Sequence, residues 1–160
     1  MSTQPIAPAQ FITFTLGAET FAVNVSQVRE VLELSLITRV PGAPDCMRGV
    51  VNVRGKAVPV ADLRAKFGLA HAADTINSRI LVMELEIDGD TVVVGGIADS
   101  VQEVVELDAA QVSPPPRIGL RWRSEVIEGM ARRGEDFVII LDLGAVFSLD
   151  DLRLPASEAA

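Results

Sequence analysis

The chain contains the same series of segments twice, and this repetition constrains its fold more than any other feature. The segment VREVLEL at 28–34 matches VQEVVEL at 101–107, which lies 73 positions later. Near the end of each copy, the segment that begins at Asp62 matches the one that begins at Asp142, 80 positions later. An internal repeat indicates a structural unit that is built twice and packs against its own copy. We therefore expect two related units, with a longer middle loop in the second.

Each copy divides into five short apolar segments followed by a short helical one. The apolar segments are rich in Val, Ile and Phe, and turn residues such as LGAET and IDGDT separate them, which is typical of strands and hairpins. The sixth segment begins with an aspartate that can cap a helix. Five strands closed by a helix predict a small β-barrel, and two copies predict two. The strands are expected at 11–17, 20–25, 28–34, 49–54 and 56–63, and at 79–87, 91–97, 101–107, 126–133 and 136–143, with helices at 62–68 and 142–149.

The size of each unit predicts how the two are arranged. A barrel of fewer than ~80 residues has a marginal core when it stands alone. We therefore expect the barrels to pack against each other and to exchange strands. The first barrel is placed roughly at 11–70 and the second roughly at 78–152. Residues 1–10 and 153–160 are rich in Pro, Ala and Ser, so we expect them to be poorly ordered.

An arginine stands before a glycine in the last hairpin of each copy. Arg54 matches Arg133, 79 positions later, whereas the aspartates that follow are 80 apart, so this alignment predicts one extra turn residue in the second copy. If Val51 and Val53 face the core, Arg54 faces outward beside the turn. We expect Arg54 to contact a partner and Arg133 to be solvated.

The segment at 28–34 does not alternate simply between apolar and polar residues. Its four apolar side chains, Val28, Val31, Leu32 and Leu34, are spread over both faces of a strand. Some of them are expected to stay exposed or to be covered by the other barrel. Exposed apolar area with charged flanks is typical of a protein interface.

The overall charge disfavours a nucleic-acid partner. The formal net charge is −8, aromatic residues make up 4%, and Tyr is absent. Proteins that bind nucleic acids need a basic face, and single strands need aromatic stacking. Two local basic groups keep a single-stranded nucleic-acid-binding barrel as the alternative function, although neither is interleaved with Tyr or Phe. They are Arg54, Lys56, Arg64 and Lys66, and Arg117, Arg121 and Arg123.

No pattern of residues predicts a catalytic, cofactor or metal site. His71 stands alone in a loop-like stretch, Cys46 has no histidine nearby, and metal ligands do not cluster. The glycines in VVVGGIAD lack the spacing of a phosphate-binding loop and predict close backbone packing in a strand. Aspartic proteases pair one Asp from each half, but the aspartates at 62 and 142 are followed by Leu, and helix caps explain both. We expect no enzyme and no cofactor.

Two features predict the compartment. A single cysteine cannot form an internal disulfide, which fits a reducing environment. The opening MSTQPIAPAQ lacks the basic and apolar regions of a secretory signal peptide. We expect a cytoplasmic protein.

Several motifs resemble those of a known family. The stretch VPGAPDCMRGVVNVRGKAVPVADLRAKFGL at 40–69, followed in order by SVQEVVEL, VSPPP, VIEGM and FVIILDL, resembles the signature of the CheW family of bacterial chemotaxis coupling proteins. The likeness extends over 11–152. It implies an all-β fold with short helices, in which two SH3-like five-stranded β-barrels pack together and are related by internal duplication. The length favours a stand-alone coupling protein.

The resemblance also implies a function and a set of contact residues. It implies a non-catalytic adaptor that couples the cytoplasmic tip of methyl-accepting chemotaxis receptors to the regulatory domain of the histidine kinase CheA. Such a protein is cytoplasmic and is recruited to membrane-anchored receptor arrays. Arg54 matches the Arg of the family that serves receptor and kinase coupling. Val28 and Glu30 match a Val-x-Glu element near the receptor groove, and Arg117 and Ile118 match a region of contact with kinase domains.

Overall fold

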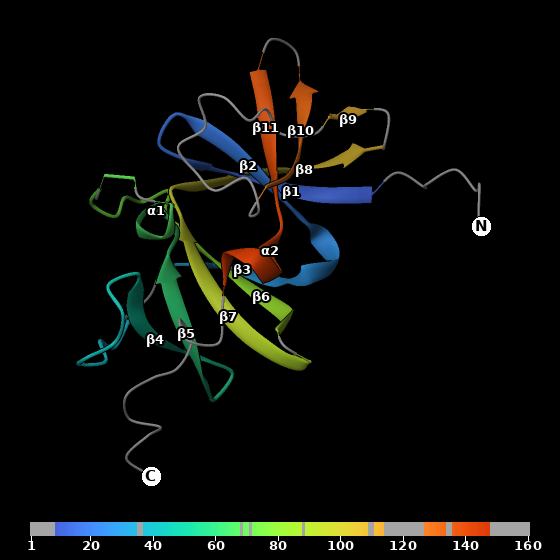
Figure 1. Cartoon of the computed structure of the whole chain (residues 1–160). Helices are drawn as coiled ribbons and strands as arrows, with labels where there is room; N and C mark the ends of the chain where they lie inside the picture. Colours follow the sequence, from blue (N-terminus) through green and yellow to red (C-terminus); the bar gives the residue numbers. More distant parts are fainter. Residues whose placement is uncertain are drawn as a thin grey trace.

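Two β-sheets joined by short helices make up the described part of the chain (Figure 1). The structure, a computed structural model, describes residues 9–34, 37–67, 69–70, 72–87, 89–108, 111–113, 127–133 and 136–147. The ends expected to be poorly ordered lie outside these residues, except that the first strand already begins at Ala9. None of the helices that the structure describes is long and apolar enough to cross a membrane.

The strands fall into two sheets, here called sheet A and sheet B. In the described ranges, sheet A has the spatial order β8 (Ser100–Leu107), β1 (Ala9–Leu16), β2 (Glu19–Asn24), β11 (Asp136–Leu141), β10 (Ile127–Arg133) and β9 (Val112–Ser113). Sheet B has the order β3 (Val28–Glu33), β6 (Arg79–Ile87), β7 (Asp90–Ala98), β5 (Lys56–Asp62) and β4 (Met47–Val53). The helices are η1 (Val25–Gln27), α1 (Leu63–Lys66) and α2 (Leu143–Val146).

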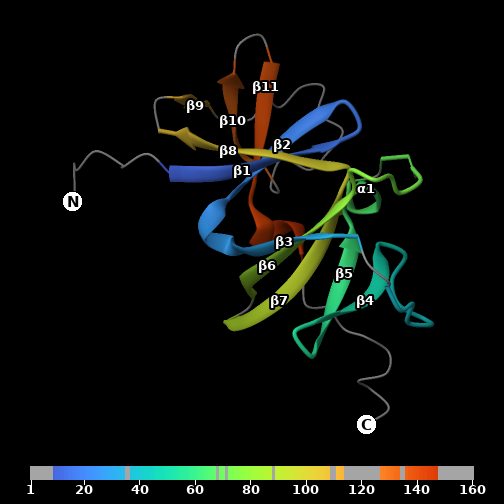
Figure 2. The ribbon, with the colours of Figure 1, turned by 180° about the vertical axis from the view of Figure 1, so that it is seen from behind.

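The two halves of the chain exchange strands reciprocally. Sheet A combines the β1–β2 hairpin of the first half with β8, β9, β10 and β11 of the second, and sheet B combines the β6–β7 hairpin of the second half with β3, β4 and β5 of the first. In both sheets the junction between the halves is a parallel pair, β2 with β11 and β7 with β5. Figures 1 and 2 show the two sheets one above the other. Each sheet is therefore complete only with strands from both halves of the chain.

Both sheets contain a register shift in their last hairpin. The pairing of β4 with β5 shifts register between Met47 and Gly49, and the pairing of β10 with β11 shifts between Ile127 and Gly129. A Cβ atom at Gly49 would overlap the carbonyl group of Thr38, whereas one at Gly129 would lie 2.5 Å from a methyl group of Val112. Each glycine therefore lets a preceding segment approach the bulged strand, through the bridge between Thr38 and Val50 in sheet B and through β9 in sheet A.

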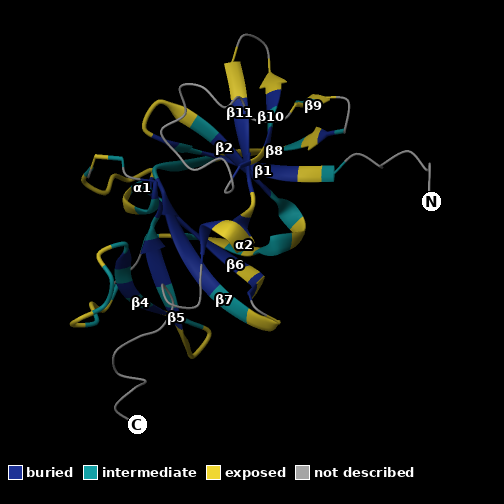
Figure 3. Cartoon of the chain, in the orientation of Figure 1, coloured by how far each residue is buried: buried dark blue, intermediate teal, exposed yellow. Residues whose placement is uncertain are grey.

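The buried side chains form one large cluster shared by both sheets and one smaller cluster in each. Figure 3 shows, in dark blue, that buried residues occur along strands of both sheets. Alternate residues of a strand point to opposite faces, so one face of each sheet supplies the shared cluster and the other supplies the cluster of its own sheet. Both short helices contribute to the shared cluster, and the ring of Phe67 stacks on that of Phe21 of β2 at 5.5 Å. The expected pair of packed barrels is confirmed.

The predicted helix caps are confirmed. The Asp62 carboxylate accepts a hydrogen bond from the backbone N–H of Arg64 at 3.0 Å, and the Asp142 carboxylate accepts one from Ala145 at 3.3 Å. The predicted close packing at the paired glycines is also confirmed, because a Cβ at Gly96 would lie 3.1 Å from the Leu63 side chain.

The expected extra turn residue in the second copy is wrong. Val53 pairs with Lys56 across the β4–β5 hairpin, and Arg133 pairs with Asp136 across the β10–β11 hairpin, so two residues separate the strands in both. Arg133 therefore corresponds to Val53 and lies in a strand. Arg54 instead lies in the turn, where its φ of 54° is unusual for a residue other than glycine.

Candidate functional site

A groove lies on sheet B at the end of the β4–β5 hairpin. Figure 1 shows this hairpin in the lower part of the view. Its volume is about 460 Å³, within the range typical of binding pockets. Strands β3, β4, β5, β6 and β7 all contribute to it. The residues that line this β4–β5 groove are Arg29, Glu30, Val53, Arg54, Lys56, Ala57, Val58, Val82 and Val93.

The turn places Arg54 at the rim of the groove. Both central turn residues, Arg54 and Gly55, have positive φ values, which is typical of a tight type I′ hairpin turn. The Asn52 side chain accepts a hydrogen bond from the Gly55 N–H at 2.8 Å and holds the turn in place. The side chain of Arg54 remains 82% exposed, as expected for a residue that faces outward.

An ion pair joins the turn to the opposite edge of sheet B. The Arg54 guanidinium donates to the Glu30 carboxylate of β3 at 3.3 Å. The Glu30 side chain is only 25% exposed, so it fixes one end of the guanidinium and leaves the rest open to solvent. Exposed ion pairs contribute little stability, so this pair matters more for the orientation of Arg54 than for folding.

The rim of the groove is basic and its floor is apolar. Arg29 pairs with Glu84 at 3.3 Å, whereas the ammonium of Lys56 forms no ion pair with any residue that the structure describes. Valines from four strands form the floor. The rim thus carries three cations and one carboxylate around the valine side chains. This arrangement suits a partner segment that combines an apolar side chain with a carboxylate.

The structure brings together two of the five predicted contact residues. Glu30 and Arg54 form the ion pair at the rim. Val28 lies on the same strand as Glu30 but packs, half-buried, against the shared cluster and does not line the groove. Arg117 and Ile118 lie outside the described residues.

Sequence reasoning missed the part of the groove that comes from the second half. Val82 and Val93 belong to β6 and β7, and their place beside β4 and β5 follows from the strand exchange. Arg29 was also missed, although it is next to Glu30 in the sequence, and Lys56 was named only as a member of a basic group and not as a contact residue.

Sheet A carries a smaller counterpart of the groove, here called the β10–β11 hollow. Its ion pair links Arg133 to Glu103 at 3.1 Å, so Arg133 is not simply solvated as expected. Glu103 corresponds to Glu30 in the repeat, which places the two ion pairs at equivalent edges of the two sheets. The lining residues are Thr20, Gln102, Arg133, Asp136, Phe137 and Val138.

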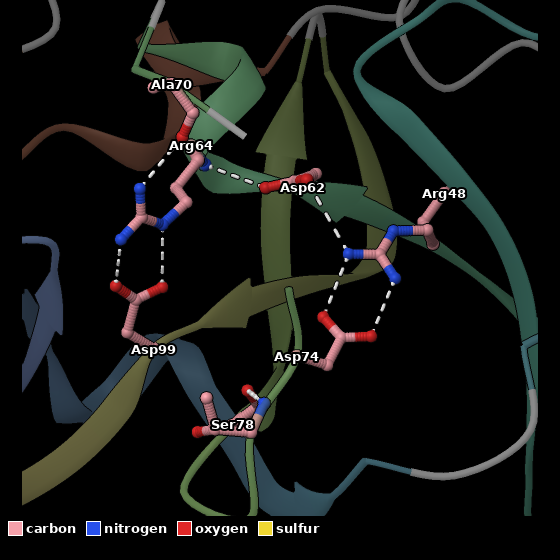
Figure 4. A network of polar contacts seen from close by, with 8 residues as sticks. Arg48, Asp62, Arg64, Ala70, Asp74, Ser78 and Asp99 are labelled. Atoms are coloured by element: carbon pink, nitrogen blue, oxygen red, sulfur yellow. Dashed lines mark hydrogen bonds and ion pairs between the residues drawn. The ribbon is translucent and has the colours of Figure 1, made fainter. Parts of the chain in front are cut away.

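A second polar cluster joins the sheets near α1 (Figure 4). The guanidinium of Arg64 donates to both oxygens of Asp99, at 2.9 and 2.6 Å, and to the Ala70 carbonyl at 2.8 Å. The Asp99 carboxylate also accepts from the Gly17 N–H of the β1–β2 turn at 2.7 Å. The hydrogen bond from Arg64, aided by that from Gly17, holds the pKa of Asp99 below its ordinary value.

A neighbouring arginine belongs to the same polar region. Arg48 of β4 makes a bidentate contact with Asp74 at 3.0 and 3.1 Å and lies 3.6 Å from the Asp62 carboxylate. Arg64 and Arg48 thus serve intramolecular pairs, so Arg64 does not act together with the other members of the basic group that the sequence suggested. No cluster of three metal-ligating side chains occurs among the described residues.

Comparisons with known proteins agree on one family. The family model described as CheW-like domain matches residues 10–151. The chain is 32% identical over 145 residues to the chemotaxis protein CheW of Klebsiella aerogenes, covering 91% of this chain and 85% of that protein. It is 26% identical over 144 residues to the chemotaxis protein CheW of Treponema pallidum, covering 90% and 85%.

A solved structure shows the same fold. The crystal structure of the scaffolding protein TtCheW from Thermoanaerobacter tengcongensis aligns with a TM-score of 0.79 and 29% sequence identity. The alignment covers 98% of this chain and 97% of the other. The likeness therefore extends to both sheets and their arrangement as two SH3-like barrels.

Proposed function

The chain belongs to the CheW-like domain family, and from this premise we propose that it is a non-catalytic adaptor of bacterial chemotaxis signalling. It couples the cytoplasmic tip of methyl-accepting receptors to the regulatory domain of the histidine kinase CheA. Its place of action is the cytoplasm, at membrane-anchored receptor arrays. The family match over residues 10–151 supports this proposal, because it covers both barrels.

The β4–β5 groove supports a role in receptor binding. An amphipathic helix binds a groove by inserting apolar side chains and placing charged ones at the rim. The valine floor accepts the apolar side chains, and Arg54, held at one end by Glu30, presents free hydrogen-bond donors to a carboxylate. Val28, next to this rim on β3, orients the strand from its place in the shared cluster.

The shared core supports the coupling mechanism. Strands of both halves cross into both sheets, so the two barrels move as one body. A receptor that binds one surface and a kinase domain that binds another, with Arg117 and Ile118 as the proposed kinase contacts, are then held in a fixed arrangement. Binding that differs between the conformations of the kinase shifts their populations, and no reactive group is needed.

The test is the substitution Arg54→Glu, with Arg133→Glu as the matched control. Both arginines pair with a glutamate at equivalent edges, so each change breaks one exposed ion pair. We expect Arg54→Glu to weaken capture of a receptor cytoplasmic fragment about tenfold, which is ~1.4 kcal/mol. Arg133→Glu leaves capture unchanged. The thermal midpoints of both variants stay near that of the parent chain, since surface changes are usually small.

Three results would contradict the proposal. Equal receptor binding by the parent chain and Arg54→Glu removes the groove from the site. Failure of the parent chain to bind either the receptor fragment or the kinase regulatory domain removes the adaptor function. Salt-sensitive retention of single-stranded DNA at physiological salt favours the nucleic-acid alternative instead.

A further inference from the structure

The chain crosses from one sheet to the other at two equivalent places in the described ranges. It leaves sheet A after β2 to form β3 of sheet B, and it leaves sheet B after β7 to form β8 of sheet A. Ser26 of the first crossing lies 73 positions before Asp99 of the second, as the repeat requires. At the first crossing, the Asn24 side chain accepts a local hydrogen bond from the Ser26 N–H at 2.9 Å. The contacts of Asp99 reach much farther along the chain.

Asp99 is bonded to elements of both sheets. Its carboxylate accepts from the guanidinium of Arg64 on α1, the helix that follows β5 of sheet B (Figure 4). The same carboxylate accepts from the Gly17 N–H in the β1–β2 turn of sheet A, and the Asp99 N–H donates to the Thr15 carbonyl at 2.9 Å. The contact of Arg64, Asp99 and Gly17 is here called the α1 latch. Every other ion pair among the described residues joins strands of one sheet or a sheet and its own loop.

The α1 latch lies between the strands that carry the two hollowed surfaces. Helix α1 begins directly after β5, which lines the β4–β5 groove. Gly17 lies shortly before Thr20 of β2, which lines the β10–β11 hollow. The shared apolar core holds the sheets together, but burial of apolar surface is not directional. A bidentate contact between arginine and carboxylate fixes direction as well as distance.

The second copy lacks a counterpart of the α1 latch. Gly144 of α2 lies 80 positions after Arg64, and Ser26 takes the place of Asp99. Neither counterpart carries a charge, so the same ion pair cannot form at the first crossing. A charged tie therefore fixes one crossing and not the other. We expect loss of the latch to change the angle between the sheets while the shared core keeps both barrels folded.

We propose that Arg64 and Asp99 are positioning residues for coupling: the α1 latch sets the angle between the two sheets, and this angle determines how strongly a partner bound to one sheet acts on a partner bound to the other. Neither residue has to contact a partner. The effect on coupling rests on the proposed adaptor function, whereas the effect on the angle does not. A change of angle leaves each binding surface intact, so it alters coupling without altering binding.

The angle is measured with the purified chain by residual dipolar couplings, which report the orientation of the backbone N–H bonds of each sheet. Asp99→Asn is compared with Asp74→Asn. Asp74 also accepts a bidentate contact from an arginine, Arg48, and its side chain is 35% exposed against 32% for Asp99, but this contact stays with sheet B. We expect a changed orientation between the sheets in Asp99→Asn and none in Asp74→Asn. Arg64→Lys keeps the charge but loses the planar fork, so it also changes the orientation.

Coupling is measured as receptor-dependent autophosphorylation of the kinase in a reconstituted mixture. We expect Asp99→Asn to lower this activity about fivefold or more, the low end of typical coupling. Its capture of a receptor fragment and of the kinase regulatory domain changes less than about twofold, as for a surface change away from the contacts. Asp74→Asn leaves coupling and capture unchanged. The double variant Arg64→Ala with Asp99→Asn loses no more coupling than either single variant, because the two residues act as one unit.

Three results would overturn the role of the α1 latch. The first is the same sheet orientation in the parent chain and Asp99→Asn. The second is an equal loss of coupling in Asp74→Asn. The third is a loss of capture as large as the loss of coupling, which would place the residues in binding or general stability. A parent chain that fails to couple receptor and kinase contradicts the proposed function instead, and the orientation measurement then decides the role of the latch by itself.

Discussion

The β4–β5 and β10–β11 hairpins are the same structure with two different surfaces. Both have two-residue turns, a bulge after the first residue pair, a glycine at that bulge and an aspartate that caps the following helix. Around the turn, however, Val53 and Lys56 of one hairpin correspond to Arg133 and Asp136 of the other. The first borders an apolar groove with a basic rim, and the second a more polar hollow.

The comparison separates residues that the fold requires from residues that are free to change. Core positions on β5 and β11 stay apolar in both copies, as Val58 and Val138 show, because each fills the small cluster of its own sheet. Positions that face solvent at the hairpin ends have no packing role, so one copy can become a binding groove while the other does not.

The largest effect is expected at the bulge glycines. Gly49→Ala places a methyl group against the Thr38 carbonyl and forces a φ of 150°, so we expect a loss of ~3 kcal/mol or more from strain and overpacking. Gly129→Ala meets the movable Val112 side chain at 2.5 Å and costs about 1–3 kcal/mol. Urea unfolding measures both. Equal losses at the two sites would show that the backbone clash and the positive φ at Gly49 do not matter.

A smaller loss of stability is expected from a contact that helix α1 makes and helix α2 lacks. Helix α1 carries Arg64, which ties it to Asp99, whereas α2 has Gly144 at that position. Asp99→Asn weakens this charged contact, so we expect a loss of about 1–2 kcal/mol at pH 7.

The pH dependence of the stability tests whether the charge of Asp99 causes the loss expected for Asp99→Asn. Because its pKa is lowered in the folded state, its contribution is present above the ordinary carboxyl pKa of 3.8 and is lost as the pH falls below that value. The stability difference between the parent chain and Asp99→Asn is therefore constant well above pH 3.8 and shrinks as the pH is lowered through 3.8 and below. A difference that does not shrink as the pH falls below 3.8 would assign the loss to packing instead.

The smallest effect is expected at the two helix caps. Asp62→Ala removes a cap whose side chain is only 14% exposed and lies near Arg48, and we expect a loss of ~1 kcal/mol. Asp142→Ala removes an exposed cap with a longer hydrogen bond and costs about 0.5 kcal/mol. Thermal unfolding of both variants gives the comparison. A larger loss of stability in Asp142→Ala than in Asp62→Ala would contradict the expectation that the more buried cap contributes more.

Much of the local structure could be predicted from sequence. The expected strands at 28–34, 49–54 and 56–63 are found as Val28–Glu33, Met47–Val53 and Lys56–Asp62. Val31 on that strand is exposed, as its broken alternation indicated. These features depend on neighbours in the chain, and local patterns record them well.

The candidate site was predicted only in part, for two physical reasons. Glu30 and Arg54 belong to local motifs, but Val82 and Val93 reach the groove through pairing between distant strands. The match of Arg54 with Arg133 also failed, because two hairpins can conserve an arginine while shifting it by one position. A shift of one residue in a strand moves a side chain to the other face, or from a strand into a turn.

By itself, the sequence determined the repeat, the order of the strands along the chain, the capped helices and the family, since all of these depend on short-range patterns and motifs. Only the tertiary structure decided that each sheet is assembled from both halves, and which side chains meet at the groove. Which strands pair depends on hydrogen bonds and burial between residues that are far apart in the sequence. The apolar pattern of a strand does not reveal its partner, because the pattern is the same whichever strand it pairs with. The energy of the whole packed core selects among the pairings, and that energy exists only once both halves are in place.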